Sequence, residues 1–150
     1  VALDEITDPH NLGAVARVAE GAGADGLLVT RHRSAEVTAA VSRASAGAVE
    51  HLPIARVTNL ADTLIAARRP GLWSYAAAGD AERRHWQHDY RDGTVFVLGA
   101  EGKGLRPRVR DSCDEAVAVP MRGKVESLNA SAALVAALFA YVLPSRQAEP

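Results

Sequence analysis

Residues 117–131, VAVPMRGKVESLNAS, decide the fold because they have the pattern of a strand, a loop and the start of a capped helix. Val117 and its β-branched neighbours suit a buried strand, and Pro120 should end it because proline cannot donate a hydrogen bond within a sheet. Ser127 and Asn129 are both favoured N-cap residues, so we expect the helix to begin at one of them. Loops of this kind bind ligands in open α/β sheets, although an ordinary strand-to-helix connection has the same local pattern.

Length and composition indicate one globular domain. The chain has 150 residues, of which 48% are hydrophobic and 23% charged, and its net charge of −1 argues against a strongly basic nucleic-acid binder while allowing a local basic face. The single cysteine, Cys113, excludes an intramolecular disulfide framework and fits a reducing cytoplasm, which is the predicted location. The apolar run at residues 130–143 is too short to span a membrane, so no membrane association is expected.

Segments of strand and helix character alternate along the chain. The expected strands are residues 1–6, 26–30, 51–57, 72–78, 94–98 and 115–119. The expected helices are residues 12–21, 35–46, 60–69, 107–112 and 130–143. Asn59 should cap the third helix, and residues 79–93 lack any period and should be irregular. This alternation predicts an α/β fold with a mainly parallel sheet flanked by helices.

The sequence also suggests a domain division. We expect one catalytic domain over residues 1–143 and a polar tail over residues 144–150. Because residues 1–6 already resemble a strand and carry no initiator methionine, we expect that an N-terminal domain precedes them.

Two glycine-rich segments could approach a ligand. Residues 21–26, GAGADG, match a dinucleotide fingerprint, but they follow a helix and precede a strand, which is the wrong order for a nicotinamide-binding Rossmann enzyme. Residues 99–104, GAEGKG, do follow a strand, and their glycines permit close approach to a planar or bulky ligand. Glu101 would place a carboxylate at the carboxyl edge of the sheet, although a solvated loop fits this segment equally well.

Polar residues near the first helix could share a cleft with these loops. If the turn at Asp8 lies at the same sheet edge, Asn11 and Arg17 can face Glu101 and Ser127. Arg17 interrupts an apolar helix, so it is either a surface residue or a functional one. The five histidines form no ligand set with cysteines or carboxylates, so no metal is expected.

Basic residues collect near the predicted loops. They are Arg31, Arg33, Arg43, Arg106, Arg108, Arg110, Arg122 and Lys124. Such a set is either a solvated face or a patch that follows the phosphates of a nucleic acid.

Three segments together resemble the SpoU (TrmH-type) family of RNA ribose 2′-O-methyltransferases, within the SPOUT superfamily. They are residues 8–13 with Arg17, residues 98–105, and residues 119–123 with 127–129. Further segments resemble the subgroup that methylates a guanosine ribose in large-subunit ribosomal RNA, namely residues 33–35, 45–50 and 57–61. A transfer-RNA or resistance-type enzyme of the same family is the alternative.

The resemblance implies a C-terminal trefoil knot, a homodimer, an RNA substrate and S-adenosylmethionine as the cofactor. The implied cofactor-binding residues are Leu98, Gly99, Ala100, Gly102, Val119, Met121, Leu128 and Asn129. The implied catalytic residues are Asn11, Arg17, Glu101, Ser127 and Asn129. The expected RNA-binding residues are Arg31, Arg33, Arg106, Arg122 and Lys124.

The role of Arg17 follows from guanidinium chemistry. Arginine is a poor general base because its pKa exceeds about 12. We therefore expect Arg17 to stabilise a developing alkoxide or to hold an RNA phosphate, with Glu101 orienting it, and leave the base open. A non-catalytic RNA-binding or ribosome-assembly module on the same fold is the second hypothesis, and the intact catalytic set argues against it.

Overall fold

A parallel sheet forms the centre of the protein. A computed structural model describes residues 1–88, 90, 93–123 and 128–146. The strands are β1 (Ala2–Asp4), β2 (Leu27–Thr30), β3 (Ile54–Val57), β4 (Trp73–Ala77), β5 (Thr94–Gly99) and β6 (Glu115–Val117). They form a six-stranded sheet in the order β3-β2-β1-β5-β4-β6, and each neighbouring pair is parallel. The predicted α/β class with a mainly parallel sheet is therefore confirmed.

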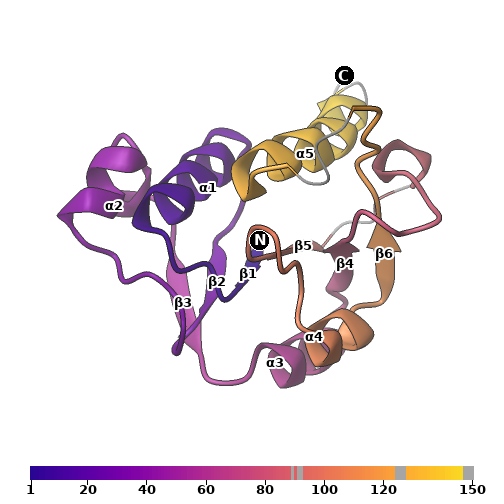
Figure 1. The fold of residues 1–150 in the computed structure, drawn as a ribbon, viewed down its shortest axis with the longest axis horizontal. Coiled ribbons are helices and arrows are strands. Elements are labelled where there is room, and N and C mark those ends of the chain that lie inside the picture. The colour runs from indigo at the N-terminus through magenta and orange to yellow at the C-terminus, as the bar shows by residue number, and fades with distance from the viewer. Residues whose placement is uncertain (89, 91–92, 124–127, 147–150) are drawn as a thin grey trace.

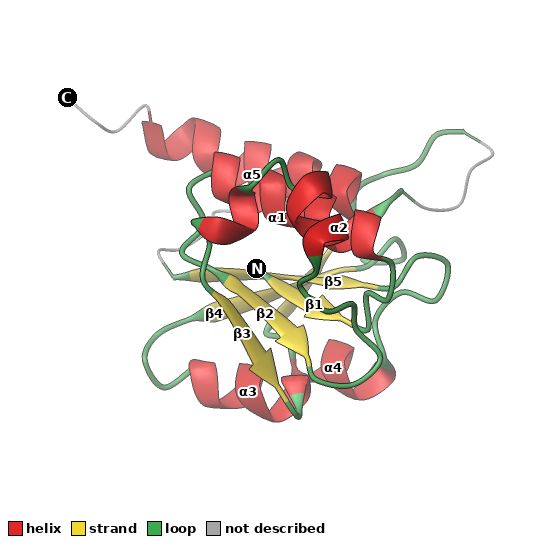
Figure 2. Ribbon diagram, turned by 90° about the vertical axis from the view of Figure 1, so that its left-hand side faces the viewer, coloured by secondary structure: helices red, strands yellow, loops and turns green. Residues whose placement is uncertain are grey.

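Helices cover both faces of this sheet. They are α1 (Pro9–Gly21), α2 (Ala39–Ala44), α3 (Leu60–Ala67), α4 (Pro107–Ser112) and α5 (Ala130–Arg146), with short 3-10 turns η1 (Ala48–Glu50) and η2 (His85–Gln87). Figure 2 shows α1, α2 and α5 on one face and α3 and α4 on the other. Each face has its own buried apolar cluster, one around Leu12 and Leu134 and one around Leu60 and Val97.

The first helix begins earlier than the sequence pattern predicted. It starts at Pro9 instead of Leu12, because the Asp8 side chain accepts a hydrogen bond from the His10 backbone N–H at 2.9 Å. Proline is well suited to the first helical position, since its missing N–H would have no partner there. Asn11 therefore lies in the first turn of α1 and not in a preceding loop.

Three other helices also differ from their predicted bounds, and the first of them, α3, ends at Ala67 instead of Arg69. Helix α2 covers residues 39–44 instead of 35–46. The Ala35 backbone N–H donates to the carbonyl of Ile6 at 2.8 Å, which holds the start of segment 35–38 outside the helix. Helix α5 continues to Arg146, beyond the predicted end at Leu143. The predicted caps are confirmed, since the side chain of Asn59 accepts from the Asp62 N–H at 3.2 Å.

Helix α5 begins after Asn129, one of the two N-cap residues predicted from the sequence. The Asn129 side chain accepts from the Ser131 backbone N–H at 2.9 Å, and its carbonyl accepts from the Ala133 N–H at 3.0 Å. Ser127, the other candidate cap, lies outside the described residues. In Figure 1, α5 (yellow) lies beside α1 (indigo), and the two helices are in contact.

Helix α1 also packs closely against α2. A β-carbon on Gly13 would overlap Ala44, so only glycine permits this approach. The segment 21–26 connects α1 to β2, which confirms the order of elements that excluded it as a dinucleotide fingerprint. Within the described part of the chain, no helix is long and apolar enough to span a membrane.

Candidate functional site

The loop after β5 is a tight turn that lies against its own strand. The Gly104 backbone N–H donates to the carbonyl of Ala100 at 2.8 Å, which closes the loop. A β-carbon on Gly99 would overlap the backbone of Gly104 and Leu105. Gly102 and Gly104 have φ angles of 76° and 67°, which side chains other than glycine rarely adopt. The glycines of residues 99–104 therefore fix the shape of this loop.

A cavity of about 330 Å³ lies at the carboxyl ends of β4 and β5. Seven of the eight residues expected to bind the cofactor line it: Leu98, Gly99, Ala100, Gly102, Val119, Met121 and Leu128. The eighth, Asn129, lies beside the lining residues Leu128 and Ala130 but does not line the cavity itself. The volume of the cavity is within the range of small-molecule sites, about 300–1,000 Å³. Apolar walls and glycine backbone therefore enclose a space of the size that a small ligand needs.

Sequence reasoning missed one wall of this cavity. Residues 77–80, at the end of β4, line it together with Arg110 from α4. Arg110 donates to the Asp80 carboxylate at 2.9 Å, and this hydrogen bond holds the pKa of Asp80 below its usual value. The sequence could not predict this wall, because nothing in the local sequence pattern shows that β4 lies between β5 and β6 in the sheet. Only the order of strands in the sheet places its end at the cavity.

Three of the expected catalytic residues meet beside the cavity. The Asn129 side-chain N–H donates to Oδ1 of Asn11 at 2.6 Å. The Asn11 side-chain N–H in turn lies 3.5 Å from Oε2 of Glu101, at the limit of a hydrogen bond. Residues from the start of α1, the loop after β5 and the start of α5 thus form one polar cluster, which we call the Asn11 cluster.

Arg17 is not part of the Asn11 cluster. It is exposed on α1, and no hydrogen bond or ion pair holds its guanidinium to another of the described residues. Six residues of an α-helix turn it by about 600°, so Arg17 and Asn11 lie on different sides of α1. The expected contact of Arg17 with Glu101 is absent from the described chain, where Glu101 meets Asn11 instead. Ser127 lies outside the described residues, so its expected place in the cluster stays a prediction.

The expected RNA-binding arginines differ in how free they are. Arg31, Arg33 and Arg122 are exposed, and Nη1 of Arg33 lies 3.7 Å from Oε1 of Glu5. Arg106, by contrast, donates from Nε and Nη2 to the buried carboxylate of Asp4 at 2.9 and 2.7 Å. Lys124 lies outside the described residues. The guanidinium of Arg106 is therefore already committed to a partner within the fold.

The described residues contain no group of three or more histidine, cysteine or acidic side chains that could hold a metal ion. The one cysteine, Cys113, is half-buried, and burial raises the pKa of its thiol to about 12. A thiol with this pKa is protonated at neutral pH and is a poor nucleophile.

Comparison with known proteins identifies the class to which this fold and cavity belong. The family model described as the SpoU rRNA Methylase family matches residues 1–139, and the chain belongs to this family. Its curated relatives include the 23S rRNA (guanosine-2′-O-)-methyltransferase RlmB of Pseudomonas syringae pv. tomato, 47% identical over 91% of this chain and 55% of the relative. The RlmB of Pseudomonas aeruginosa is 45% identical over 93% of this chain and 56% of the relative. The chain thus spans little more than half the length of these relatives.

Solved structures share the same fold. The SpoU methyltransferase AviRb from Streptomyces viridochromogenes in complex with the cofactor AdoMet has a TM-score of 0.88 and 30% identity, covering 97% of this chain and 60% of that chain. An AdoMet-bound rRNA methyltransferase from Sinorhizobium meliloti has a TM-score of 0.86 and 29% identity, covering 99% of this chain and 56% of that chain.

Proposed function

We propose that the protein transfers a methyl group from S-adenosylmethionine to the ribose 2′-hydroxyl of a guanosine in large-subunit ribosomal RNA. The observation that carries this proposal is the position of the Asn11 cluster, whose Glu101 lines the same cavity as most of the residues expected to bind the cofactor. Relatives named as 23S rRNA guanosine methyltransferases support the substrate.

The cavity fits the chemistry of S-adenosylmethionine. Leu98, Val119, Met121 and Leu128 offer apolar walls to an adenine ring. The β-carbon position of Gly99 is filled by the backbone of Gly104 and Leu105, so the loop lies against its own strand, whereas Gly102 and Gly104 have open space there, which allows a flat ligand to approach the loop backbone closely. The Glu101 carboxylate suits the positive charge of a sulfonium, whereas the Asp80 carboxylate is already paired with Arg110. When bound, the cofactor supplies an electrophilic methyl group.

The chain itself supplies alignment and charge. Holding the ribose hydroxyl in line with the methyl group accounts for much of the expected rate, since well-oriented partners react with effective molarities of about 10⁵ M or more. Glu101, which lines the cavity, and Asn11, which meets Glu101, are placed to orient the ribose by hydrogen bonds. Arg17 is exposed and unpaired among the described residues, which leaves it available to an RNA phosphate or to a developing alkoxide.

The RNA would follow the exposed basic residues of the carboxyl edge. Arg31 and Arg33 follow β2, and Arg122 follows the cavity residue Met121. Arg106 contributes less to RNA binding in this proposal, because its guanidinium is held by Asp4. The family resemblance further supports a homodimer, a C-terminal trefoil knot, a cytoplasmic location and a separate N-terminal RNA-recognition domain, and these remain proposals.

A direct test incubates the protein with S-adenosylmethionine and a transcript of 23S ribosomal RNA, followed by mass spectrometry of the nucleosides. The proposal predicts 2′-O-methylguanosine, and strongly reduced product with Glu101→Gln. Methylation of transfer RNA alone would favour the transfer-RNA alternative. RNA binding without any methyl transfer, in a sample that binds the cofactor, would favour the non-catalytic module.

A further inference from the structure

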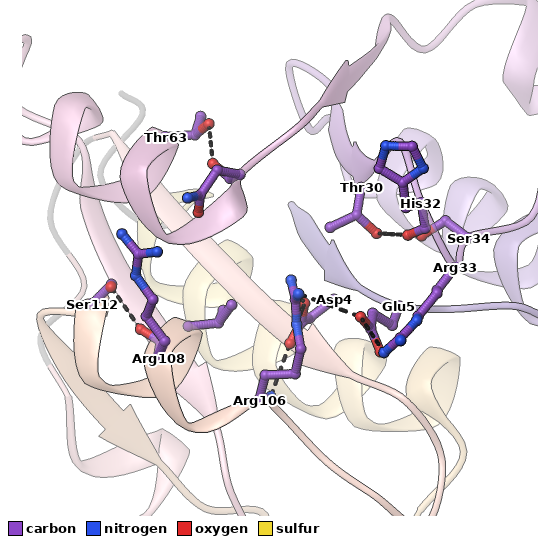
Figure 3. Close-up of polar contacts among 12 residues, drawn as sticks. Asp4, Glu5, Thr30, His32, Arg33, Ser34, Thr63, Arg106, Arg108 and Ser112 are labelled. Atoms are coloured by element: carbon purple, nitrogen blue, oxygen red, sulfur yellow. Dashed lines mark hydrogen bonds and ion pairs between the residues drawn. The ribbon is translucent and has the colours of Figure 1, made fainter.

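Asp4 is a buried carboxylate next to the cofactor loop. It ends β1, its side chain is 0% exposed, and its Cα lies opposite that of Gly99 in the parallel ladder. The Arg106 backbone N–H donates to Oδ2 of Asp4 at 2.9 Å, and the Arg106 guanidinium donates twice to Oδ1 (Figure 3). Burying a carboxylate is costly unless it is paired and hydrogen-bonded, and Arg106 meets both requirements.

These hydrogen bonds hold the two ends of the loop together. The chain leaves the sheet at Gly99 and comes back to it at Arg106. Residues 104–106 form the return limb of the loop, and the backbone of Gly104 and Leu105 in this limb lies directly over Gly99. Asp4, from the neighbouring strand, fixes this return limb through both the backbone and the side chain of Arg106. Because the intervening residues line the cavity, a shift of the return limb would change the shape of the cavity.

The same arginine also connects the loop with a basic segment. Nη1 of Arg106 lies 3.3 Å from Oε1 of Glu5, and the same oxygen lies 3.7 Å from Nη1 of Arg33 (Figure 3). Glu5 follows β1 and Arg33 follows β2, so the ion pairs extend along the carboxyl edge of the sheet. One guanidinium thus joins the cofactor loop to a residue expected to contact RNA.

We propose that Asp4 is a positioning residue that, through Arg106, holds the loop 99–104 in the shape that binds S-adenosylmethionine. This inference rests on the proposed function. Asp4 does not line the cavity, so its effect on the cofactor passes through the loop. If Asp4 has this positioning role, its substitution should weaken cofactor affinity by a larger factor than it lowers the turnover rate at saturating cofactor.

Asp114 offers a matched control. Its side chain is 7% exposed and accepts from the backbone N–H and hydroxyl of Ser74 at 2.8 and 2.7 Å and from Nε of Arg68 at 2.6 Å. It pairs with a backbone donor and an arginine just as Asp4 does. It precedes β6 and therefore lies at the amino edge of the sheet, opposite the cavity.

The test compares the full chain with Asp4→Asn and Asp114→Asn, by calorimetric titration with S-adenosylmethionine and by methyl transfer to 23S transcript. We expect Asp4→Asn to raise the Kd for the cofactor about tenfold or more, as loss of charge-assisted hydrogen bonds implies, with kcat restored at saturating cofactor. Asp114→Asn should leave the Kd for the cofactor within about twofold of wild type, even if it lowers the unfolding temperature as much as Asp4→Asn does.

The outcomes separate this inference from the function on which it rests. Wild-type protein that binds no cofactor would overturn both. Wild-type protein that binds and methylates, together with an Asp4→Asn variant whose Kd equals that of Asp114→Asn, would overturn the positioning role alone. A loss of kcat that saturating cofactor does not restore would also overturn it.

A second variant keeps the test decisive if Asp4→Asn does not fold. Arg106→Lys keeps a positive charge beside the buried carboxylate but loses the two-point guanidinium contact. We expect it to raise the Kd by about threefold or more while the circular dichroism spectrum stays that of wild type. A folded Arg106→Lys variant with wild-type affinity would overturn the inference.

Discussion

Asn129 donates a hydrogen bond to Asn11 at 2.6 Å across 118 positions of sequence. The same Asn129 side chain caps α5 by accepting from the Ser131 N–H at 2.9 Å. One amide therefore begins a helix with its oxygen and joins the start of α5 to the start of α1 with its nitrogen. Because Asn11 also meets Glu101, the geometry of the Asn11 cluster depends on this contact.

This contact predicts coupled effects on stability. Asn129→Ala should lower the free energy of unfolding by about 1 kcal/mol through the lost cap, and further through the lost bond to Asn11. In a double-mutant cycle with Asn11→Ala, chemical denaturation should give a coupling energy of about 0.5–1.5 kcal/mol. Strictly additive effects would show that the two amides do not interact in solution.

Gly99 should tolerate no side chain. Gly99→Ala places a β-carbon in the backbone of Gly104 and Leu105, so we expect the loop to be displaced and cofactor affinity to fall at least about tenfold. Gly21→Ala is the matched control, because a β-carbon there meets nothing within 4 Å and Gly21 lies in the last turn of α1. Calorimetric titration of both variants measures the difference, and equal affinities would contradict the described loop.

Arg17 should matter for methyl transfer and not for cofactor binding. It does not line the cavity, so Arg17→Lys should bind S-adenosylmethionine as wild type does. Its activity should nevertheless fall about tenfold or more, because an ammonium cannot reproduce planar guanidinium contacts with a phosphate or alkoxide. Methyl-transfer rates under saturating cofactor measure this, and near-complete activity would rule out a guanidinium-specific role.

Asp114 should make stability depend on pH in the acid range. Burial alone would raise the pKa of Asp114, but hydrogen bonds from Ser74 and the charge of Arg68 outweigh it and leave the pKa below its usual value. A carboxyl with a lowered pKa stabilises the fold above the unfolded value of about 4 and loses this contribution as pH falls through the folded value.

The corresponding variant tests the sign of this effect. Asp114→Asn should lower the free energy of unfolding at pH 7 by about 1–3 kcal/mol, and the difference from wild type should shrink as the pH falls below about 4. Asp80→Asn is the control, since that carboxylate is largely exposed and its pair with Arg110 is open to solvent. Urea titrations over a pH series measure both, and a difference that grows toward acid would contradict the assignment.

Local chemistry explains what the sequence could predict. The alternation of strand and helix segments predicted the α/β class, and the asparagine caps predicted the starts of α3 and α5. Both signals depend only on residues that are close together in the sequence. The start of α1 was missed by three positions because the pattern of apolar residues begins only at Leu12, whereas the Asp8 cap and Pro9 set the true start. Helix bounds therefore followed capping more closely than hydrophobic periodicity.

Long-range features could not be predicted in the same way. The order of strands brings the end of β4 to the cavity, and it pairs Asp4 with Arg106 across 102 positions. Nothing near either residue in the sequence indicates this pairing, so Arg106 was expected to bind RNA. The residues themselves suggested that the glycine loop approaches a ligand and that Asn11 and Glu101 share a cleft, but they fitted a solvated loop equally well, and the family resemblance favoured the functional interpretation.

The proposed function depends on binding of S-adenosylmethionine in the cavity lined by residues 98–105, Val119, Met121 and Leu128. Calorimetric titration of the purified chain with this cofactor tests it most directly. We expect about one site per chain for wild type. Leu128→Glu, which places a carboxylate in the apolar wall, should abolish that binding. A folded wild-type sample that releases no binding heat, or a Leu128→Glu variant with undiminished affinity, would contradict it.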